Sequence, residues 1–150
     1  MNFKLYKNFF NFEKEFDFNC LIKMINFNSL PSYNTWQENE DDIFGSVFTI
    51  DNIHKVDYFK IIFEELNKKF NLNNKRSNLH IFTSFKYGSK GKMHQDREDV
   101  YIFGLHGHTC YLIDNKPYVV SPGDMIWIKN GIPHQSIGLT PRIIASFGIY

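Results

Sequence analysis

Two histidines and one aspartate have the residue types and spacing of a metal site. His94 and Asp96 are separated by one residue, and alternate residues of an extended strand point to the same face of a sheet. His134 follows a Gly-Ile-Pro turn farther along the chain and offers a third ligand. Two imidazoles and one carboxylate leave coordination positions open, which suits non-haem Fe(II) working with oxygen. The alternative is that the His-x-Asp pattern arises by chance and that His134 is a packed or surface histidine.

The distribution of histidine and glycine places any such site in the C-terminal half. Five of the six histidines and eight of the nine glycines follow residue 79. Glycines mark turns, and histidines are the side chains that titrate near neutrality and bind metals most often. His80 alternates with Leu79 and Ile81 in an apolar stretch, where it could line a cavity or be a satisfied core histidine.

The elements that must position these residues are short strands. From residue 79 onward, apolar segments alternate with turn residues such as Gly88-Ser89-Lys90-Gly91, Asp114-Asn115-Lys116 and Ser121-Pro122-Gly123-Asp124. The predicted strands cover 79–87, 100–105, 109–113, 117–120, 125–128, 135–139 and 142–150. Seven or eight short strands at regular spacing predict a mainly β fold, either a sandwich or a small barrel.

The first half of the chain predicts an α+β extension that braces this barrel. Over 54–70, apolar residues recur at spacings of three and four, which predicts one amphipathic helix. The segment 43–50 predicts a strand, and 29–42 predicts a loop. We therefore expect a single domain over 1–150, with a bracing region at 1–78 and a barrel core at 79–150.

Composition excludes several other classes of protein. The chain has 150 residues, 17 Lys+Arg, 16 Asp+Glu and a net charge of +1, so no strong field favours nucleic acid or a membrane surface. No apolar run reaches the roughly 18 residues of a membrane span, and the N-terminus lacks a basic-then-apolar leader pattern. Cys20 and Cys110 are the only cysteines, too few for a disulfide framework. We expect a cytoplasmic protein with no nucleic-acid or membrane partner.

Beyond these features, the C-terminal half resembles the cupin superfamily. Gly88, five residues and His94 match the opening of the first cupin motif, and Gly104 lies near its close. Gly123-Asp124 through Gly131 to His134 match the second motif, with Lys129 in place of the usual proline. The resemblance implies a double-stranded β-helix, the jelly-roll barrel of cupins, that binds a metal through His94, Asp96 and His134.

Within the superfamily, the motifs resemble the JmjC-type branch of the 2-oxoglutarate oxygenases. The matching segments are 94–101, Gly107, 121–128, 132–134 and Ser146-Phe147-Gly148. This branch implies Fe(II) and 2-oxoglutarate as cofactors. The extra glutamate ligand of ordinary cupins has no counterpart, because Val100 or Tyr101 falls where it would lie, and this favours the three-ligand oxygenase site.

The residues that would bind 2-oxoglutarate depart from that pattern. JmjC-type oxygenases place a Lys or Arg two residues after the glycine, for the distal carboxylate, and here the position is Thr109. Arg142 is the candidate substitute, because other 2-oxoglutarate oxygenase families place an arginine near the start of the last strand. Ser146 shares the strand parity of Arg142, and Tyr111 that of Thr109. The candidate cofactor-binding residues are therefore Arg142, Ser146, Tyr111 and Thr109, with no catalytic residue beyond the metal ligands.

Three functions remain open from the sequence. The first is an Fe(II)- and 2-oxoglutarate-dependent dioxygenase, a hydroxylase-type oxidoreductase acting on a small-molecule or peptide substrate. The second, supported by Thr109, is a metal-binding cupin enzyme that does not use 2-oxoglutarate, such as a small-molecule dioxygenase or isomerase. The third is a non-catalytic cupin-like binding or sensor protein, against which the intact triad argues. Phe9-Phe10 is compatible with a homodimer contact or with an ordinary core.

Overall fold

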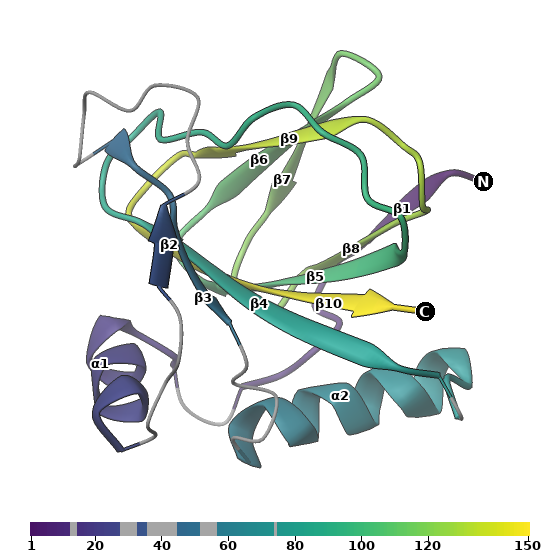
Figure 1. Cartoon of the computed structure of the whole chain (residues 1–150), viewed down its shortest axis with the longest axis horizontal. Helices are drawn as coiled ribbons and strands as arrows, with labels where there is room; N and C mark the ends of the chain where they lie inside the picture. Colours follow the sequence, from purple (N-terminus) through teal and green to yellow (C-terminus); the bar gives the residue numbers. More distant parts are fainter. Residues whose placement is uncertain (13–14, 28–32, 36–44, 52–56, 74) are drawn as a thin grey trace.

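The structure, a computed structural model, describes residues 1–12, 15–27, 33–35, 45–51, 57–73 and 75–150. Two antiparallel sheets face each other, and two helices lie on the outer face of the larger sheet (Figure 1). The helices are α1 (Phe18–Phe27) and α2 (Asp57–Phe70). The strands are β1 (Phe3–Tyr6), β2 (Tyr33–Thr35), β3 (Phe48–Asp51), β4 (Ser77–Ser84), β5 (Asp99–His106), β6 (Thr109–Ile113), β7 (Lys116–Val120), β8 (Met125–Ile128), β9 (His134–Gly138) and β10 (Arg142–Ile149).

The order of strands places β10 at the centre of the larger sheet. That sheet runs β1-β8-β5-β10-β4-β3-β2, and the smaller sheet runs β7-β6-β9. The segment 88–94 continues the smaller sheet beyond β9 through isolated bridges, Lys90 to Ile137 and His94 to His134. Two sheets joined in this way form a jelly roll, so the predicted mainly β class is confirmed.

Strand alternation divides the larger sheet into two packing faces. Odd-numbered residues, such as Phe103 and Phe147, pack against the helices. Even-numbered residues, such as Ile102 and Ile144, face the smaller sheet. Because side chains alternate along a strand, β4, β5 and β10 contribute to both cores at once. The even-numbered face forms one wall of the barrel interior and carries the candidate site residues of β10.

Helix α2 covers the outer face of the larger sheet with its apolar stripe. Phe59, Ile62 and Leu66 are buried, at the three- and four-residue spacings that bring side chains to one helical face. Asp57 lies in the first turn, and Lys68 and Lys69 lie in the last, so each charge complements the end of the helix dipole that it occupies. The predicted helix is confirmed from Asp57 to Phe70, and its expected first turn lies outside the described residues.

The extension contains, besides the predicted helix, a second helix, α1, which the sequence did not predict. Asp17 caps it by accepting a hydrogen bond from the Cys20 backbone N–H at 2.8 Å. Leu21 is buried in the core of the helical layer. The described part of the chain contains no helix long and apolar enough to cross a membrane.

The N-terminal extension also supplies strands to the larger sheet. β1, which the sequence did not predict, pairs antiparallel with β8. The predicted strand over 43–50 is shorter than expected, since β3 begins at Phe48 and 43–44 lie outside the described residues. Most of the predicted loop at 29–42 also lies outside them, and β2 occupies Tyr33–Thr35.

Candidate metal and cosubstrate site

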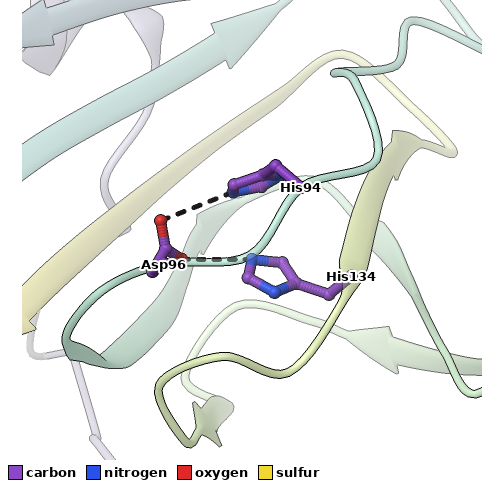
Figure 2. Close-up of side chains that lie close together, drawn as sticks. All are labelled: His94, Asp96 and His134. Carbon is purple, nitrogen blue, oxygen red and sulfur yellow. Dashed lines mark ion pairs between the residues drawn. The ribbon is translucent and has the colours of Figure 1, made fainter.

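His94, Asp96 and His134 converge on one point at an end of the barrel interior (Figure 2). The Nε2 atoms of His94 and His134 lie 3.6 Å and 3.4 Å from the two carboxylate oxygens of Asp96, and a set of one ligand atom from each residue lies within 4.8 Å of one another. Donors about 2.1 Å from one ion and at right angles to each other lie about 3 Å apart. The three side chains therefore fit a shared metal ion.

The backbone around each histidine fixes which ring nitrogen faces the others. Nδ1 of His94 donates to the Lys92 carbonyl at 3.0 Å, and Nδ1 of His134 donates to the Ile132 carbonyl at 2.9 Å. A carbonyl oxygen only accepts hydrogen bonds, so each Nδ1 carries a proton, and in the neutral imidazole the lone pair is then on Nε2, which faces Asp96. This arrangement orients metal-binding histidines in proteins generally.

The local backbone differs from the strand that the sequence predicted for His94 and Asp96. His94 lies in an isolated bridge, and Asp96 lies in the loop before β5. The Gly131 N–H donates to the Asp96 carbonyl at 2.8 Å and so ties this loop to the turn before β9. The two side chains still converge, although they are not on a regular strand.

His134 is the most buried member of the triad, with 2% of its surface exposed. Burial lowers the pKa of His134, and the neighbouring His94 acts in the same direction, while the hydrogen bond to Ile132 and the charge of Asp96 act against it. A lower pKa favours the neutral imidazole, which is the form that binds metals.

The triad opens into a cavity of about 210 Å³ between the two sheets. Its wall on the larger sheet is built from even-numbered residues of β4, β5 and β10, including Phe82, Ile102 and Ile144. Its wall on the smaller sheet includes Tyr111 and Ser136. A mostly apolar cavity with a few polar groups converging on it is the usual form of a small-ligand site.

Arg142 is buried beside this cavity, on the same face of β10 as Ser146. Its residue exposure is 0%. Nε donates to the Ser84 hydroxyl at 3.0 Å and Nη2 donates to the Ser136 hydroxyl at 3.4 Å, while Nη1 is buried without a hydrogen-bond partner. Among the described residues, no carboxylate lies within ion-pairing distance of this guanidinium.

A buried cation without a counter-ion is energetically unfavourable. Burial lowers the pKa of Arg142, and the Tyr111 hydroxyl acts in the opposite direction. A guanidinium nevertheless keeps its proton in proteins, so the charge persists. Burying an uncompensated charge costs several kcal/mol, in order-of-magnitude terms. The guanidinium of Arg142 is therefore suited to bind the anionic group of a ligand.

The other three candidate cofactor-binding residues also face the barrel interior. Ser146 and Tyr111 line the cavity, and burial raises the pKa of Tyr111 well above its ordinary value, so that its hydroxyl stays protonated. Thr109 is fully buried, and its Oγ1 has no hydrogen-bond partner. Thr109 pairs directly with Gly138 of β9, and residues directly opposite each other point to the same side of a sheet.

Sequence reasoning missed several polar residues of the interior. Ser136 lies two residues after His134, a spacing that predicts the same face of β9. Ser84 is paired with Arg142 across β4 and β10, which no local sequence signal reveals. His80, for which the sequence left a cavity position and a core position open, lines the cavity, and its Nδ1 is hydrogen-bonded to the Asp51 carboxylate of β3.

The two sheets and their connections define a cupin fold, and solved structures share it. A cupin 2 conserved barrel domain protein from Leptotrichia buccalis matches 76% of this chain and 44% of its own, with a TM-score of 0.51 and 16% identity. An RmlC-like cupin from Shewanella frigidimarina matches 72% of this chain and 79% of its own, with a TM-score of 0.50 and 14% identity. The expected cupin jelly roll is confirmed.

Solved structures of another protein match nearly the whole chain at a higher TM-score. YcfD, a ribosomal oxygenase from Escherichia coli, in complex with cobalt and succinic acid, matches 99% of this chain with a TM-score of 0.78 and 17% identity. The complex of YcfD with cobalt and 2-oxoglutarate gives a TM-score of 0.77 and 18% identity. The chain spans about half the length of YcfD, covering 48% of it in both complexes. No family model and no curated protein matches the sequence.

Proposed function

We propose that this protein is an Fe(II)- and 2-oxoglutarate-dependent oxygenase. The observation that carries the proposal is the uncompensated, buried guanidinium of Arg142, which contacts Ser136 in the wall of the cavity that contains the triad. A ligand that chelates a metal at one end and carries a carboxylate at the other would satisfy both features. 2-Oxoglutarate has this chemistry.

The residues present fit both groups. His94, Asp96 and His134 would hold Fe(II) in the three-ligand arrangement that leaves coordination positions open. When bound, Fe(II) and 2-oxoglutarate supply the oxygen chemistry of hydroxylation, and the protein supplies coordination, orientation and a dry cavity. Phe82, Ile102 and Ile144 supply apolar surface to the wall opposite the smaller sheet.

The spacing between the two halves of the site suits a short dicarboxylate. Ser136 lies two residues beyond His134 on β9, which is about 6.5 Å along a strand, and the Arg142 Nη2 atom contacts the Ser136 hydroxyl. The guanidinium therefore contacts the residue that lies one strand repeat beyond the metal ligand His134. 2-Oxoglutarate has two methylene groups between its keto carbon and its second carboxylate, and this chain is of comparable reach.

Two buried groups would hydrogen-bond the second carboxylate. Nη1 of Arg142 and Oγ1 of Thr109 both lack partners. The two residues are neighbours of Gly138, which pairs with Thr109 across β6 and β9 and lies close to Nε of Arg142. An unsatisfied buried donor costs about 1–3 kcal/mol, and a carboxylate accepts from both at once. Arg142 thus supplies the charge that Thr109 lacks, as the sequence comparison with other oxygenase families suggested.

Similarity to YcfD supports this function without extending to its substrate. The identity is 17–18%, so the likeness concerns the fold, and activity and substrate are proposals for this chain. The open mouth of the cavity is compatible with a small molecule or with a peptide side chain.

A cupin enzyme that does not use 2-oxoglutarate is the second candidate. It is favoured by Thr109, which stands where JmjC-type enzymes carry a basic residue. In that case Arg142 would bind the carboxylate of a different substrate, and the metal site would be unchanged.

Turnover of 2-oxoglutarate separates the two candidates. Fe(II)-loaded protein incubated in air with 2-oxoglutarate and ascorbate should release succinate, detectable by mass spectrometry, even at the slow rate expected without the second substrate. The matched control is Asp96→Ala, which should release none. An Fe(II)-loaded wild-type protein that forms no succinate above this control would favour the second candidate.

A further inference from the structure

The guanidinium of Arg142 is fixed between the two sheets by two serine hydroxyls. Ser84 belongs to β4 of the larger sheet, and Ser136 belongs to β9 of the smaller sheet. Ser84 accepts from Nε at 3.0 Å, and Ser136 accepts from Nη2 at 3.4 Å. Because the guanidinium is planar, these two contacts determine where the remaining Nη1 points.

Gly138 has no side chain, and the guanidinium of Arg142 occupies the space beside it. A Cβ atom at Gly138 would lie 3.2 Å from Nε of Arg142 and 3.1 Å from the Ser84 hydroxyl. Both separations are tighter than ordinary contacts to a Cβ atom, and all three groups are buried. Gly138 is not in the left-handed region of φ, so its backbone does not require glycine. The close approach of Arg142 explains the missing side chain.

We propose that Ser84 and Gly138 are positioning residues that aim Arg142 at a ligand carboxylate and so select dicarboxylic keto acids. This inference rests on the proposed function and adds residues that touch no ligand. Ser84 fixes the orientation of the guanidinium through its hydrogen bond with Nε. Gly138 has no side chain, and this lets the guanidinium lie close to the backbone of β9. Nη1, which has no partner within the described chain, is then presented to the second carboxylate.

A purely structural role for Ser84 makes a different prediction. If the hydroxyl only stabilises the fold, its loss lowers stability and affects every ligand of the metal equally. If it positions Arg142, its loss weakens only the ligands that reach Arg142. Two keto acids distinguish these cases, because 2-oxobutyrate has the same metal-chelating end as 2-oxoglutarate and lacks the second carboxylate.

The experiment is an anaerobic titration of Fe(II)-loaded protein with each keto acid, followed by the visible charge-transfer absorption of the chelate. Wild-type protein should bind 2-oxoglutarate at least about tenfold more tightly than 2-oxobutyrate, since only 2-oxoglutarate has a second carboxylate to accept charge-assisted hydrogen bonds from Arg142. Ser84→Ala should raise the Kd for 2-oxoglutarate about tenfold and change the Kd for 2-oxobutyrate less than twofold.

Gly138→Ala provides a second, independent variant with the same expected pattern. Ser89→Ala is the matched control, because Ser89 is a buried serine whose hydroxyl donates to the Lys86 carbonyl. Ser89 contacts Gly138 through its backbone carbonyl, which accepts from the Gly138 N–H and is retained in the variant. This control should leave both dissociation constants unchanged. Thermal melts of all variants establish that each one is folded.

The outcomes separate this inference from the proposed function. Equal weakening of both keto acids by Ser84→Ala and Gly138→Ala, or no weakening of either, overturns the positioning role. A wild-type protein that binds Fe(II) but shows no preference for 2-oxoglutarate over 2-oxobutyrate overturns the proposed function itself.

Discussion

His94 and His134 exchange both of their backbone hydrogen bonds, with the His94 N–H donating to the His134 carbonyl at 3.1 Å and the His134 N–H donating to the His94 carbonyl at 2.8 Å. The two candidate imidazole ligands are thus cross-strand neighbours, and residues paired in this way project to the same side of a sheet. The separation of the ligands is set by backbone pairing. We therefore expect a site whose histidines are preorganised before the metal binds.

Metal binding should stabilise the protein through all three ligands. Addition of Co(II) at 100 times its Kd should increase the free energy of unfolding by about 2.7 kcal/mol, which appears as a rise in melting temperature. Asp96→Ala should lose this rise, and Asp114→Asn, a change in an exposed turn, should retain it. Retention of the full rise by Asp96→Ala would show that the metal binds elsewhere.

Replacing Arg142 should stabilise the fold and weaken cosubstrate binding. Arg142→Met replaces a buried, uncompensated charge by an apolar side chain of similar length, and replacing buried ion pairs by apolar residues gains about 1–4 kcal/mol in other proteins. Urea unfolding should show this increase, with the exposed Arg97→Met as the control. A lower free energy of unfolding for Arg142→Met would instead identify Arg142 as a structural group.

A positive charge introduced at position 109 of β6 should partly replace the charge of Arg142. Thr109 and Arg142 both lie against Gly138, so a lysine at position 109 would approach the same carboxylate. The double variant Thr109→Lys/Arg142→Met should bind 2-oxoglutarate more tightly than Arg142→Met alone, by calorimetry with Zn(II)-loaded protein. Equal affinities of the two variants would contradict a shared carboxylate subsite.

Asp124 should make the stability of the protein depend on acid pH. Burial alone would raise the pKa of Asp124, but hydrogen bonds from Lys7 at 2.6 Å and from the backbone N–H groups of Asn8 and Ser121, both at 3.0 Å, outweigh it and lower the pKa. A lowered pKa contributes stability above the unfolded pKa of about 3.9, and this contribution is lost as pH falls through the folded pKa.

The Asp124→Asn variant tests this contribution. We expect it to be about 1–3 kcal/mol less stable than wild type at pH 7, with the difference narrowing below pH 4, as measured by urea unfolding at each pH. Asp114→Asn serves as the surface control. A difference that stays constant with pH would assign the effect to packing.

The barrel was predictable because its local signals agree with its tertiary structure. Turn residues bound each short apolar segment, so 109–113 and 125–128 were predicted with the bounds that β6 and β8 have in the structure. α1 was missed because its apolar stripe is short and its capping residue, Asp17, gives a weak signal on its own. β1 was missed because its pairing with β8 depends on residues distant in sequence.

The candidate site was only partly predictable, because some of its contacts join residues that are distant in sequence. His94 and Asp96 are close in sequence, and motif spacing connected them to His134. Parity along one strand placed Arg142 on the same face as Ser146. In contrast, Ser84 and Gly138 contact Arg142 only through pairings between strands and between sheets, which no single segment of sequence encodes.

The central claim is that the triad and Arg142 bind the two ends of one cosubstrate. Anaerobic addition of 2-oxoglutarate to the Fe(II)-loaded protein tests it most directly, by the visible charge-transfer absorption of the chelate in wild type and in Arg142→Met. We predict saturable absorption in wild type and an affinity at least tenfold weaker in the variant, with Fe(II) binding retained by both. Absence of the absorption in Fe(II)-loaded wild type, or equal affinities in the two proteins, would contradict the account.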